Sequence, residues 1–254
     1  MSSLSLKKFV GQVAVVTGAS AGIGKAVAEL LVKNGVIVAG LARRVDRLED
    51  HSKQLINEKG KLHAFQCDLT NQQEILTTFK KITTNHGPIS VLINNAGLSI
   101  ETNIIGGDIE KWKPVLDTNI LAVAICIREA VASMKQHNLK GHIINVNSMA
   151  GHSVYDFPNA SVYPATKHAI TALTETVRLE INREKLPIKI TSLSPGYVAT
   201  DFIERAFGKA IDERLKSRAG LESKDIAETV LYILSTPDHV NVKELTVCVQ
   251  GEIF

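Results

Sequence analysis

Short apolar segments rich in β-branched residues alternate with longer, helix-like segments along the chain of 254 residues. Strands are expected at residues 13–16, 36–41, 62–65, 91–93, 143–146, 188–193 and 245–249. Helices are expected between them, at residues 23–33, 46–58, 72–85, 109–138, 162–184 and 225–234. Connections of this length suit right-handed crossovers between parallel strands. The alternation therefore predicts an α/β fold, with a seven-stranded, mostly parallel sheet covered by helices on both faces.

The composition suits one globular domain that spans residues 1–254. Hydrophobic residues make up 44% of the chain, which is enough for a substantial core. No low-complexity linker, internal repeat or shift in composition marks a domain boundary. We therefore expect a single doubly wound, Rossmann-type domain. Ligands of such sheets bind beyond the carboxyl ends of the strands, so residues that follow strands are the first candidates for a site.

The charge pattern points to a small-molecule partner. The 29 basic and 26 acidic residues are spread along the chain without a run of like charges, so neither nucleic-acid binding nor stable membrane insertion is expected. The N-terminal segment lacks the apolar core of a signal peptide, and a cytoplasmic location is expected. The odd number and apolar surroundings of Cys67, Cys126 and Cys248 favour buried thiols, and no metal site is expected.

The segment TGASAGIG, residues 17–24, lies between the first expected strand and the first expected helix. Gly18 suits a tight turn, Gly22 lets a ligand approach the main chain, and Gly24 permits close packing of helix on strand. The free N–H groups at the start of the helix attract an anion, so a dinucleotide pyrophosphate fits this turn. Glycine-rich turns also serve purely structural ends in many folds.

The end of the second expected strand indicates which cofactor would bind. Enzymes that use NAD commonly place a carboxylate here for the ribose 2′-hydroxyl, whereas an arginine suits the 2′-phosphate of NADP. This chain has Ala42, Arg43 and Arg44, and its first carboxylate is Asp46. Arg43 would pair with the phosphate and Arg44 could stack on adenine, so NADP(H) is favoured. Alternatively, the two arginines are only solvated.

Three side chains could carry proton-transfer chemistry. In YPATK, Tyr163 and Lys167 lie one helical turn apart, and a nearby ammonium is expected to lower the tyrosine pKa. Ser148 follows an expected strand, where its hydroxyl can hold a carbonyl or alkoxide oxygen against Tyr163. Asn119, among apolar neighbours, could cap a kink or hold a water. The spacing of Tyr163 and Lys167 also suits ordinary neighbours on a helix surface.

These motifs together resemble the short-chain dehydrogenase/reductase family along essentially the whole chain. NNAG at residues 94–97, SPGYVAT at 194–200 and CDLT at 67–70 complete the set. The resemblance implies a catalytic tetrad of Asn119, Ser148, Tyr163 and Lys167, in which Asn119 holds a water that links Lys167 to solvent. It implies that the cofactor is bound by Gly18, Ser20, Gly22, Ile23, Gly24, Arg43, Arg44, Asp68, Leu69, Asn95, Tyr163, Lys167, Val198 and Thr200.

Within the family, the stretches ICIREAVASMK, GHIINVNSMAGH and PATK resemble the subgroup of insect farnesol dehydrogenases and a vertebrate ketosteroid-reducing member. The resemblance implies hydride transfer between NADP(H) and an apolar alcohol, such as a farnesol-like isoprenoid, or its aldehyde or ketone. The alternatives are a ketosteroid or carbonyl reductase that uses NADPH, and a catalytically idle NADP(H)-binding sensor. The two long helices resemble those that form homodimers and homotetramers in the family.

An apolar cleft is expected beside the catalytic residues. Candidates for its lining follow the expected strands or connect the motifs: Leu98, Ile100, Val154, Tyr155, Phe157, Phe202 and Phe207. The same residues could equally complete the core or an oligomer contact. The segment 203–220 contains two glycines and lies where a lid would close over the cleft.

Overall fold

The computed structural model describes residues 4–209, 213 and 219–251. Seven strands form one sheet in the order β3-β2-β1-β4-β5-β6-β7, and all neighbouring strands are parallel. Their bounds are β1 Val13–Thr17, β2 Ile37–Ala42, β3 Lys61–Gln66, β4 Ile89–Asn94, β5 His142–Val146, β6 Lys189–Pro195 and β7 Glu244–Val247. The predicted doubly wound sheet is thus confirmed, and it is entirely parallel in the described residues.

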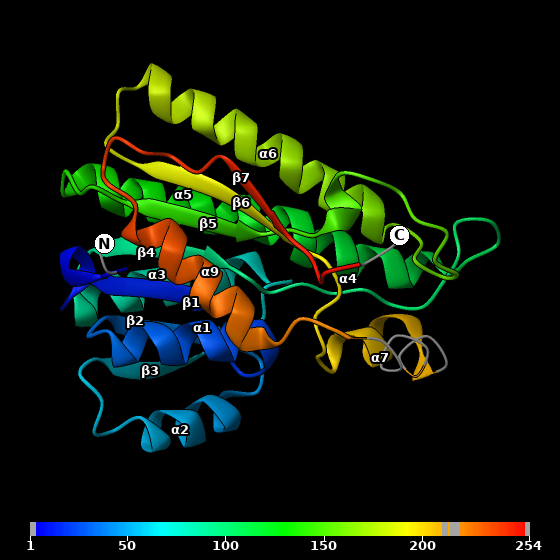
Figure 1. The fold of residues 1–254 in the computed structure, drawn as a ribbon, viewed down its shortest axis with the longest axis horizontal. Helices are drawn as coiled ribbons and strands as arrows, with labels where there is room; N and C mark the ends of the chain where they lie inside the picture. Colours follow the sequence, from blue (N-terminus) through cyan, green and yellow to red (C-terminus); the bar gives the residue numbers. More distant parts are fainter. Residues whose placement is uncertain (1–3, 210–212, 214–218, 252–254) are drawn as a thin grey trace.

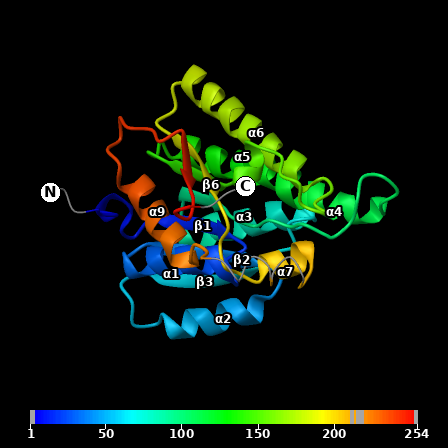
Figure 2. The ribbon, with the colours of Figure 1, turned by 45° about the vertical axis from the view of Figure 1, so that its right-hand side comes forward.

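Helices cover both faces of this sheet. One face is covered by α1 (Gly22–Lys33) and α9 (Ser223–Ser235), which lie side by side (Figures 1 and 2). The other face is covered by α3 (Gln72–His86), α5 (Ala122–Gln136) and α6 (Tyr163–Arg183), while α2 (Val45–Gln54) packs beside β3. Apolar positions of these helices recur every three to four residues, as the buried Val27, Ala28 and Leu31 of α1 illustrate.

Burial explains which strands the sequence marks most clearly. Every residue of β1, β4 and β5 is buried, because helices cover both faces of these strands. β7 is an edge strand whose residues alternate between exposed and half-buried. It covers Glu244–Val247 rather than the expected residues 245–249.

The helix expected over residues 109–138 is not uniform. It begins as the 3₁₀ turn η2 (Ile109–Lys111) and continues as α4 (Trp112–Leu116). A π-helical turn, η3 (Asp117–Leu121), then leads into α5. The single long helix was therefore the wrong prediction for this segment, because hydrophobic periodicity does not report one extra residue in a turn.

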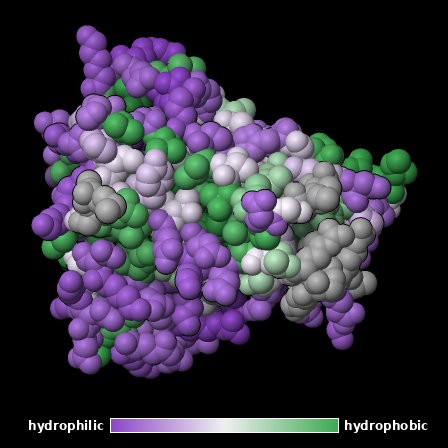
Figure 3. All heavy atoms as spheres, in the orientation of Figure 1, coloured by the Kyte–Doolittle hydropathy of each residue, from purple (hydrophilic) through white to green (hydrophobic). Residues whose placement is uncertain are grey.

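The segment after β6 leaves the layered part of the molecule. Its helix α7 (Phe202–Phe207) lies beyond the end of the sheet, apart from the helices on the two faces (Figure 1). Of the lid predicted at 203–220, residues 210–212 and 214–218 lie outside the described part of the chain. The view in Figure 3 shows a largely hydrophilic surface around α2 and hydrophobic residues across the middle of the molecule.

Candidate active site

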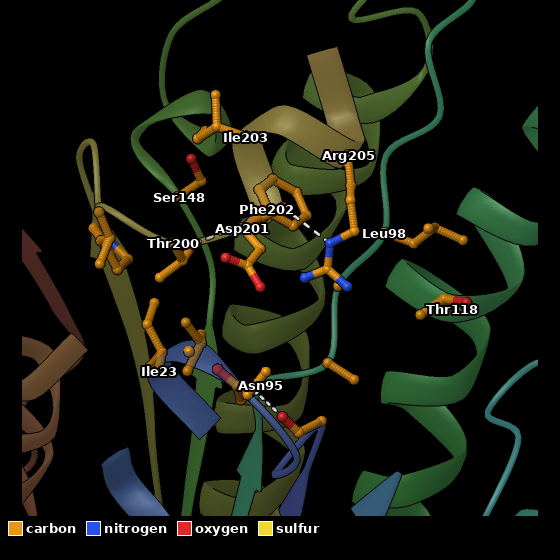
Figure 4. Close-up of a pocket in the computed structure, with 18 of the residues that line it drawn as sticks. Ile23, Asn95, Leu98, Thr118, Ser148, Thr200, Asp201, Phe202, Ile203 and Arg205 are labelled. Atoms are coloured by element: carbon orange, nitrogen blue, oxygen red, sulfur yellow. Dashed lines mark hydrogen bonds between the residues drawn. The ribbon is translucent and has the colours of Figure 1, made fainter. Parts of the chain in front are cut away.

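A cavity of about 560 Å³ lies at the carboxyl ends of five neighbouring strands. Its lining includes Gly18 after β1, Arg43 after β2, Asn95 after β4, Ser148 after β5 and Gly196 after β6. Side chains from these segments and from α7 surround one hollow (Figure 4). Parallel strands bring residues that are distant in the sequence to one edge of the sheet, where the motifs are expected to meet.

The lining contains most of the predicted site residues. They are Gly18, Ser20, Gly22, Ile23, Arg43, Arg44, Asp68, Leu69, Asn95, Ser148, Tyr163, Lys167, Val198 and Thr200. Gly24 and Asn119 lie outside the lining. Their structural positions show what each contacts.

The glycine-rich turn is built around the end of β1. Gly18 has φ +67°, which side-chain-bearing residues rarely adopt. A Cβ at Gly24 would lie 2.4 Å from both the Gly18 carbonyl oxygen and Asn95 Nδ2, so α1 could not start so close to β1 with any larger residue. Asn95 Nδ2 also donates to the Thr17 carbonyl, at 2.9 Å. These contacts tie the NNAG segment to the turn.

The residues present fit a nicotinamide dinucleotide. The first turn of α1 begins at Gly22, whose missing side chain leaves the backbone open toward Thr200, 3.3 Å from an added Cβ. Arg43 and Arg44 are exposed at the end of β2 and line the same cavity. Burial, and then the charges of neighbouring arginines, lower the pKa of Arg44. Free backbone donors at one end and guanidinium groups at the other match a ligand that carries several phosphates.

Ser148 and Tyr163 face each other inside the cavity. Ser148 caps the short 3₁₀ turn η4 (Met149–Gly151), and its oxygen accepts the Ala150 N–H at 3.1 Å. Ser148 lies close enough to Tyr163, the first residue of α6, to lower the pKa of its phenol. Burial nevertheless raises the pKa of Tyr163 to about 12, and the Ser148 contact offsets only part of this effect.

Lys167 lies one turn farther along α6, with only 6% of its surface exposed. Its Nζ donates to the Val146 carbonyl at 3.1 Å and lies 5.8 Å from the centroid of the Tyr163 ring. Burial lowers the pKa of Lys167 to about 8. The predicted lowering of the Tyr163 pKa is therefore wrong for the chain itself, because removal from water dominates the pKa of both side chains.

Asn119 is 2% exposed and lies in the π-helical turn η3. Its Oδ1 accepts the Leu98 N–H at 2.8 Å, and its Nδ2 donates to the Leu98 carbonyl at 2.8 Å and to Thr166 Oγ1 at 3.0 Å. These bonds fix the segment after β4 against the start of α6. That Asn119 holds a water for Lys167 stays a prediction.

An aromatic cluster forms one wall of the cavity. The ring centroids of Phe202 and Phe207, both on α7, lie 5.8 Å from that of Tyr163. Phe157 packs on Phe207, with ring centroids 5.7 Å apart. Leu98 and Tyr155 complete the part of the predicted apolar lining that the structure contains.

The sequence-based predictions were wrong for Ile100, Val154 and Cys248. Ile100 and Val154 are not in the lining, and Val154 is 74% exposed because its loop runs along the surface. Cys67 and Cys126 are buried as expected, but Cys248 is exposed because it follows the edge strand β7. Its Sγ lies 3.1 Å from Met149 Sδ, close to the Ser148 segment.

Other lining residues were not anticipated. Thr118 and Asp201 belong to this group, and Arg205 on α7 directs its side chain into the hollow (Figure 4). No sequence motif identifies Arg205 as a site residue. It lies far from the glycine-rich turn in the sequence, so the sequence does not indicate that both line one cavity. A basic residue three positions after Phe202 in a predicted lid was the only available signal.

Comparison with known proteins defines the class of protein. The sequence profile described as "short chain dehydrogenase" matches residues 12–210. The chain therefore belongs to the short-chain dehydrogenase/reductase family, and it is an oxidoreductase of that family.

Particular relatives cover almost the full chain. It is 43% identical over 251 residues to the "Farnesol dehydrogenase" of Aedes aegypti, covering 98% of this chain and 100% of the relative. It is 39% identical over 254 residues to the human "Dehydrogenase/reductase SDR family member 11", covering 96% of each. The alcohol dehydrogenase of the archaeon Thermococcus sibiricus, solved with 5-hydroxy-NADP, has 30% identity and a TM-score of 0.81, covering 93% of this chain and 95% of the other. Serine dehydrogenase with NADP+ has 26% identity and a TM-score of 0.86, covering 96% and 97%.

Two further observations concern membranes and metals. None of the described helices combines the length and apolar character needed to span a membrane. In the described ranges, His, Cys, Asp and Glu side chains form no group of three or more that could hold a metal ion.

Proposed function

We propose that this chain is an NADP(H)-dependent oxidoreductase that interconverts an apolar alcohol and its aldehyde or ketone. The observation that carries the proposal is the meeting of Ser148, Tyr163 and Lys167 with an aromatic wall in one cavity. Arg43 and the missing carboxylate at Ala42 support NADP(H) over NAD(H). We further propose one domain over residues 1–254 and a cytoplasmic location.

The protein's part in the reaction is to position groups and move a proton. When bound, the nicotinamide ring supplies or accepts the hydride. Tyr163 donates its phenolic proton to the substrate oxygen in reduction and accepts one in oxidation. Ser148 holds that oxygen by donating its hydroxyl hydrogen, while its own oxygen accepts the Ala150 N–H. Lys167, charged below its pKa of about 8, favours negative charge on Tyr163 and holds the nicotinamide ribose.

The wall around these groups favours an apolar substrate. Phe157, Phe202 and Phe207 offer no hydrogen-bond partner to an additional hydroxyl group. Leaving such a group buried and unpaired costs about 1–3 kcal/mol. Each buried CH₂ instead contributes about 0.8 kcal/mol, which is about fourfold in affinity. A farnesol-like isoprenoid alcohol is the substrate class we favour, in line with the name of the mosquito relative.

A homologous series of primary alcohols, extended to farnesol and assayed with NADP+, tests this substrate class. We expect kcat/KM to rise about fourfold per CH₂ until the cleft is full. The variant Phe157→Ala should flatten the rise, whereas Tyr232→Ala on the surface of α9 should leave it unchanged. A flat response in the unmodified protein, or faster reduction of a sugar with NADPH, would contradict the proposal.

Two other functions are distinguished by the same assays. The sequence motifs that resemble the ketosteroid-reducing subgroup leave a ketosteroid or carbonyl reductase as the alternative, and a steroid ketone with NADPH tests it. An NADP(H)-binding sensor would bind the cofactor and turn over none of these compounds. The meeting of Ser148, Tyr163 and Lys167 in one cavity favours an active enzyme over the sensor.

We also propose that the chain forms a homodimer or homotetramer through its long helices. Leu116 and Leu121 around the π-helical turn are 41% and 51% exposed, and Leu179 on α6 is 48% exposed. Burying them against a second copy would remove apolar surface from water. Light scattering after gel filtration should give a mass of two or four chains, and Leu121→Glu should lower it.

A further inference from the structure

Arg205 projects from α7 into the cavity without an acidic partner. Its Nε donates to the Asp201 carbonyl at 2.9 Å, which holds the guanidinium group near the first turn of α7 (Figure 4). Within the described part of the chain, no carboxylate forms an ion pair with it. Two or more guanidinium N–H groups therefore remain available to a ligand.

The cavity holds an excess of positive charge around Arg205. Burial lowers the pKa of Arg44 most, and the charges of Arg47, Arg205 and Arg43 lower it further against the opposing charge of Asp46, so these guanidinium groups lie close enough to repel Arg44. Arg205 lies on α7 and Arg44 follows the end of β2, and both line the hollow. A ligand with more than one negative charge would relieve this repulsion by binding between them.

We propose that Arg205 binds the pyrophosphate of the cofactor and thereby holds α7 closed over it. This inference rests on the proposed use of NADP(H). The hydrogen bond to the Asp201 carbonyl ties the guanidinium group to the residue that follows Thr200, and Thr200 lies against Gly22 at the start of α1. That helix start is where the pyrophosphate fits. The 2′-phosphate is assigned instead to Arg43.

The same helix connects the cofactor to the substrate wall. α7 carries Phe202 and Phe207, whose rings pack around Tyr163. An ion pair between Arg205 and the pyrophosphate therefore stabilises the wall of the substrate cleft. The cofactor should bind first, and the alcohol should bind more tightly once α7 is held in place.

Fluorescence titration of NADPH and NADH, with the full chain and without substrate, tests the assignment. Arg205→Gln should raise the Kd for both cofactors by a similar factor, about 10- to 100-fold, because both carry the pyrophosphate. Arg205→Lys should recover part of the affinity through its charge. The matched control Arg183→Gln, at the exposed end of α6, should leave both values unchanged. Added salt should weaken NADPH binding more in the unmodified protein than in Arg205→Gln.

Thermal unfolding separates a binding role from a structural one. Without cofactor, Arg205→Gln should melt no lower than the unmodified protein, because it loses one exposed hydrogen bond and relieves repulsion with Arg44. The rise in Tm on adding NADPH should shrink. Equal Kd values in Arg205→Gln and the unmodified protein, or a loss confined to NADPH, would overturn the pyrophosphate assignment. Failure of the unmodified protein to bind NADPH would instead refute the proposed function.

Discussion

The opposite pKa shifts of Lys167 and Tyr163 predict the pH dependence of catalysis. Their pKa values are about 8 and about 12, both because of burial. Reduction of a carbonyl compound needs Tyr163 protonated and Lys167 charged. Both conditions hold below pH 8, so kcat/KM for reduction should be constant there. Above pH 8 it should fall about tenfold per pH unit as Lys167 loses its proton, because Tyr163 keeps its own.

Alcohol oxidation should follow a different profile, since it needs the deprotonated form of Tyr163. At neutral pH a tyrosine with this pKa is ionised in about one molecule in 10⁵, against about one in 10³ for an ordinary tyrosine. The rate of oxidation should therefore rise about tenfold per pH unit up to pH 8. Beyond that it should level off, because the gain in phenolate is balanced by the loss of charge on Lys167.

NADPH absorbance measured with both reactants below saturation reports the groups of the free protein. Lys167→Arg is the informative variant, because arginine stays charged throughout this range. Its remaining reductase activity should show no decline near pH 8. A reduction profile of the unmodified protein that stays flat to pH 10 would refute the reasoning, as would an unchanged decline in Lys167→Arg.

Three further outcomes follow from the site. Tyr163→Phe should lower kcat about 10²- to 10⁴-fold with little change in NADPH affinity, and a near-normal kcat would exclude the proton path proposed here. Replacing Ala42 by Asp together with Arg43 by Leu should erode or invert the preference for NADP(H). Each lost phosphate contact should lower the affinity for NADP(H) by about one to two decades. Equal kcat/KM for NADPH and NADH in the unmodified protein would contradict this prediction. Lys167→Met should raise the free energy of unfolding at pH 7 by about 2 kcal/mol in urea titrations. The folded-state pKa lies below the unfolded one, so the charged lysine destabilises the fold, and the lost bond to Val146 offsets part of the gain. A lower stability of Lys167→Met would show that the bond dominates.

The sheet was predictable because its strands are buried on both faces. The runs that became β1, β4 and β5 are rich in apolar and β-branched residues, and each strand is buried along its whole length. The strand order was not predicted, because hydrophobicity does not indicate which strands are neighbours. The bounds of the edge strand β7 were predicted less accurately. Half of its residues are exposed, so it lacks the continuous apolar run of the buried strands.

The packing role of the glycine-rich turn was predictable where backbone geometry restricts the choice of residue. Gly24 illustrates this, because a Cβ there would meet the Gly18 carbonyl oxygen at 2.4 Å. The π-helical turn at Asn119 and the direction of the Tyr163 pKa shift were not predictable. Both depend on packing between segments: Asn119 on its bonds to Leu98, and Tyr163 on the side chains that exclude water.

Residue spacing alone also misjudged how Tyr163 and Lys167 interact. Four residues along a helix suggest an ammonium beside a phenol, and that arrangement alone would lower the tyrosine pKa. The fold instead buries both groups and turns Lys167 toward the Val146 carbonyl. Each side chain is thereby moved toward its neutral form, and for Lys167, which is still charged at neutral pH, this costs stability in the free protein. A dinucleotide whose ribose and phosphates meet Lys167, Arg44 and Arg205 would lower that cost, so binding of the cofactor and preparation of the proton donor are expected to be coupled.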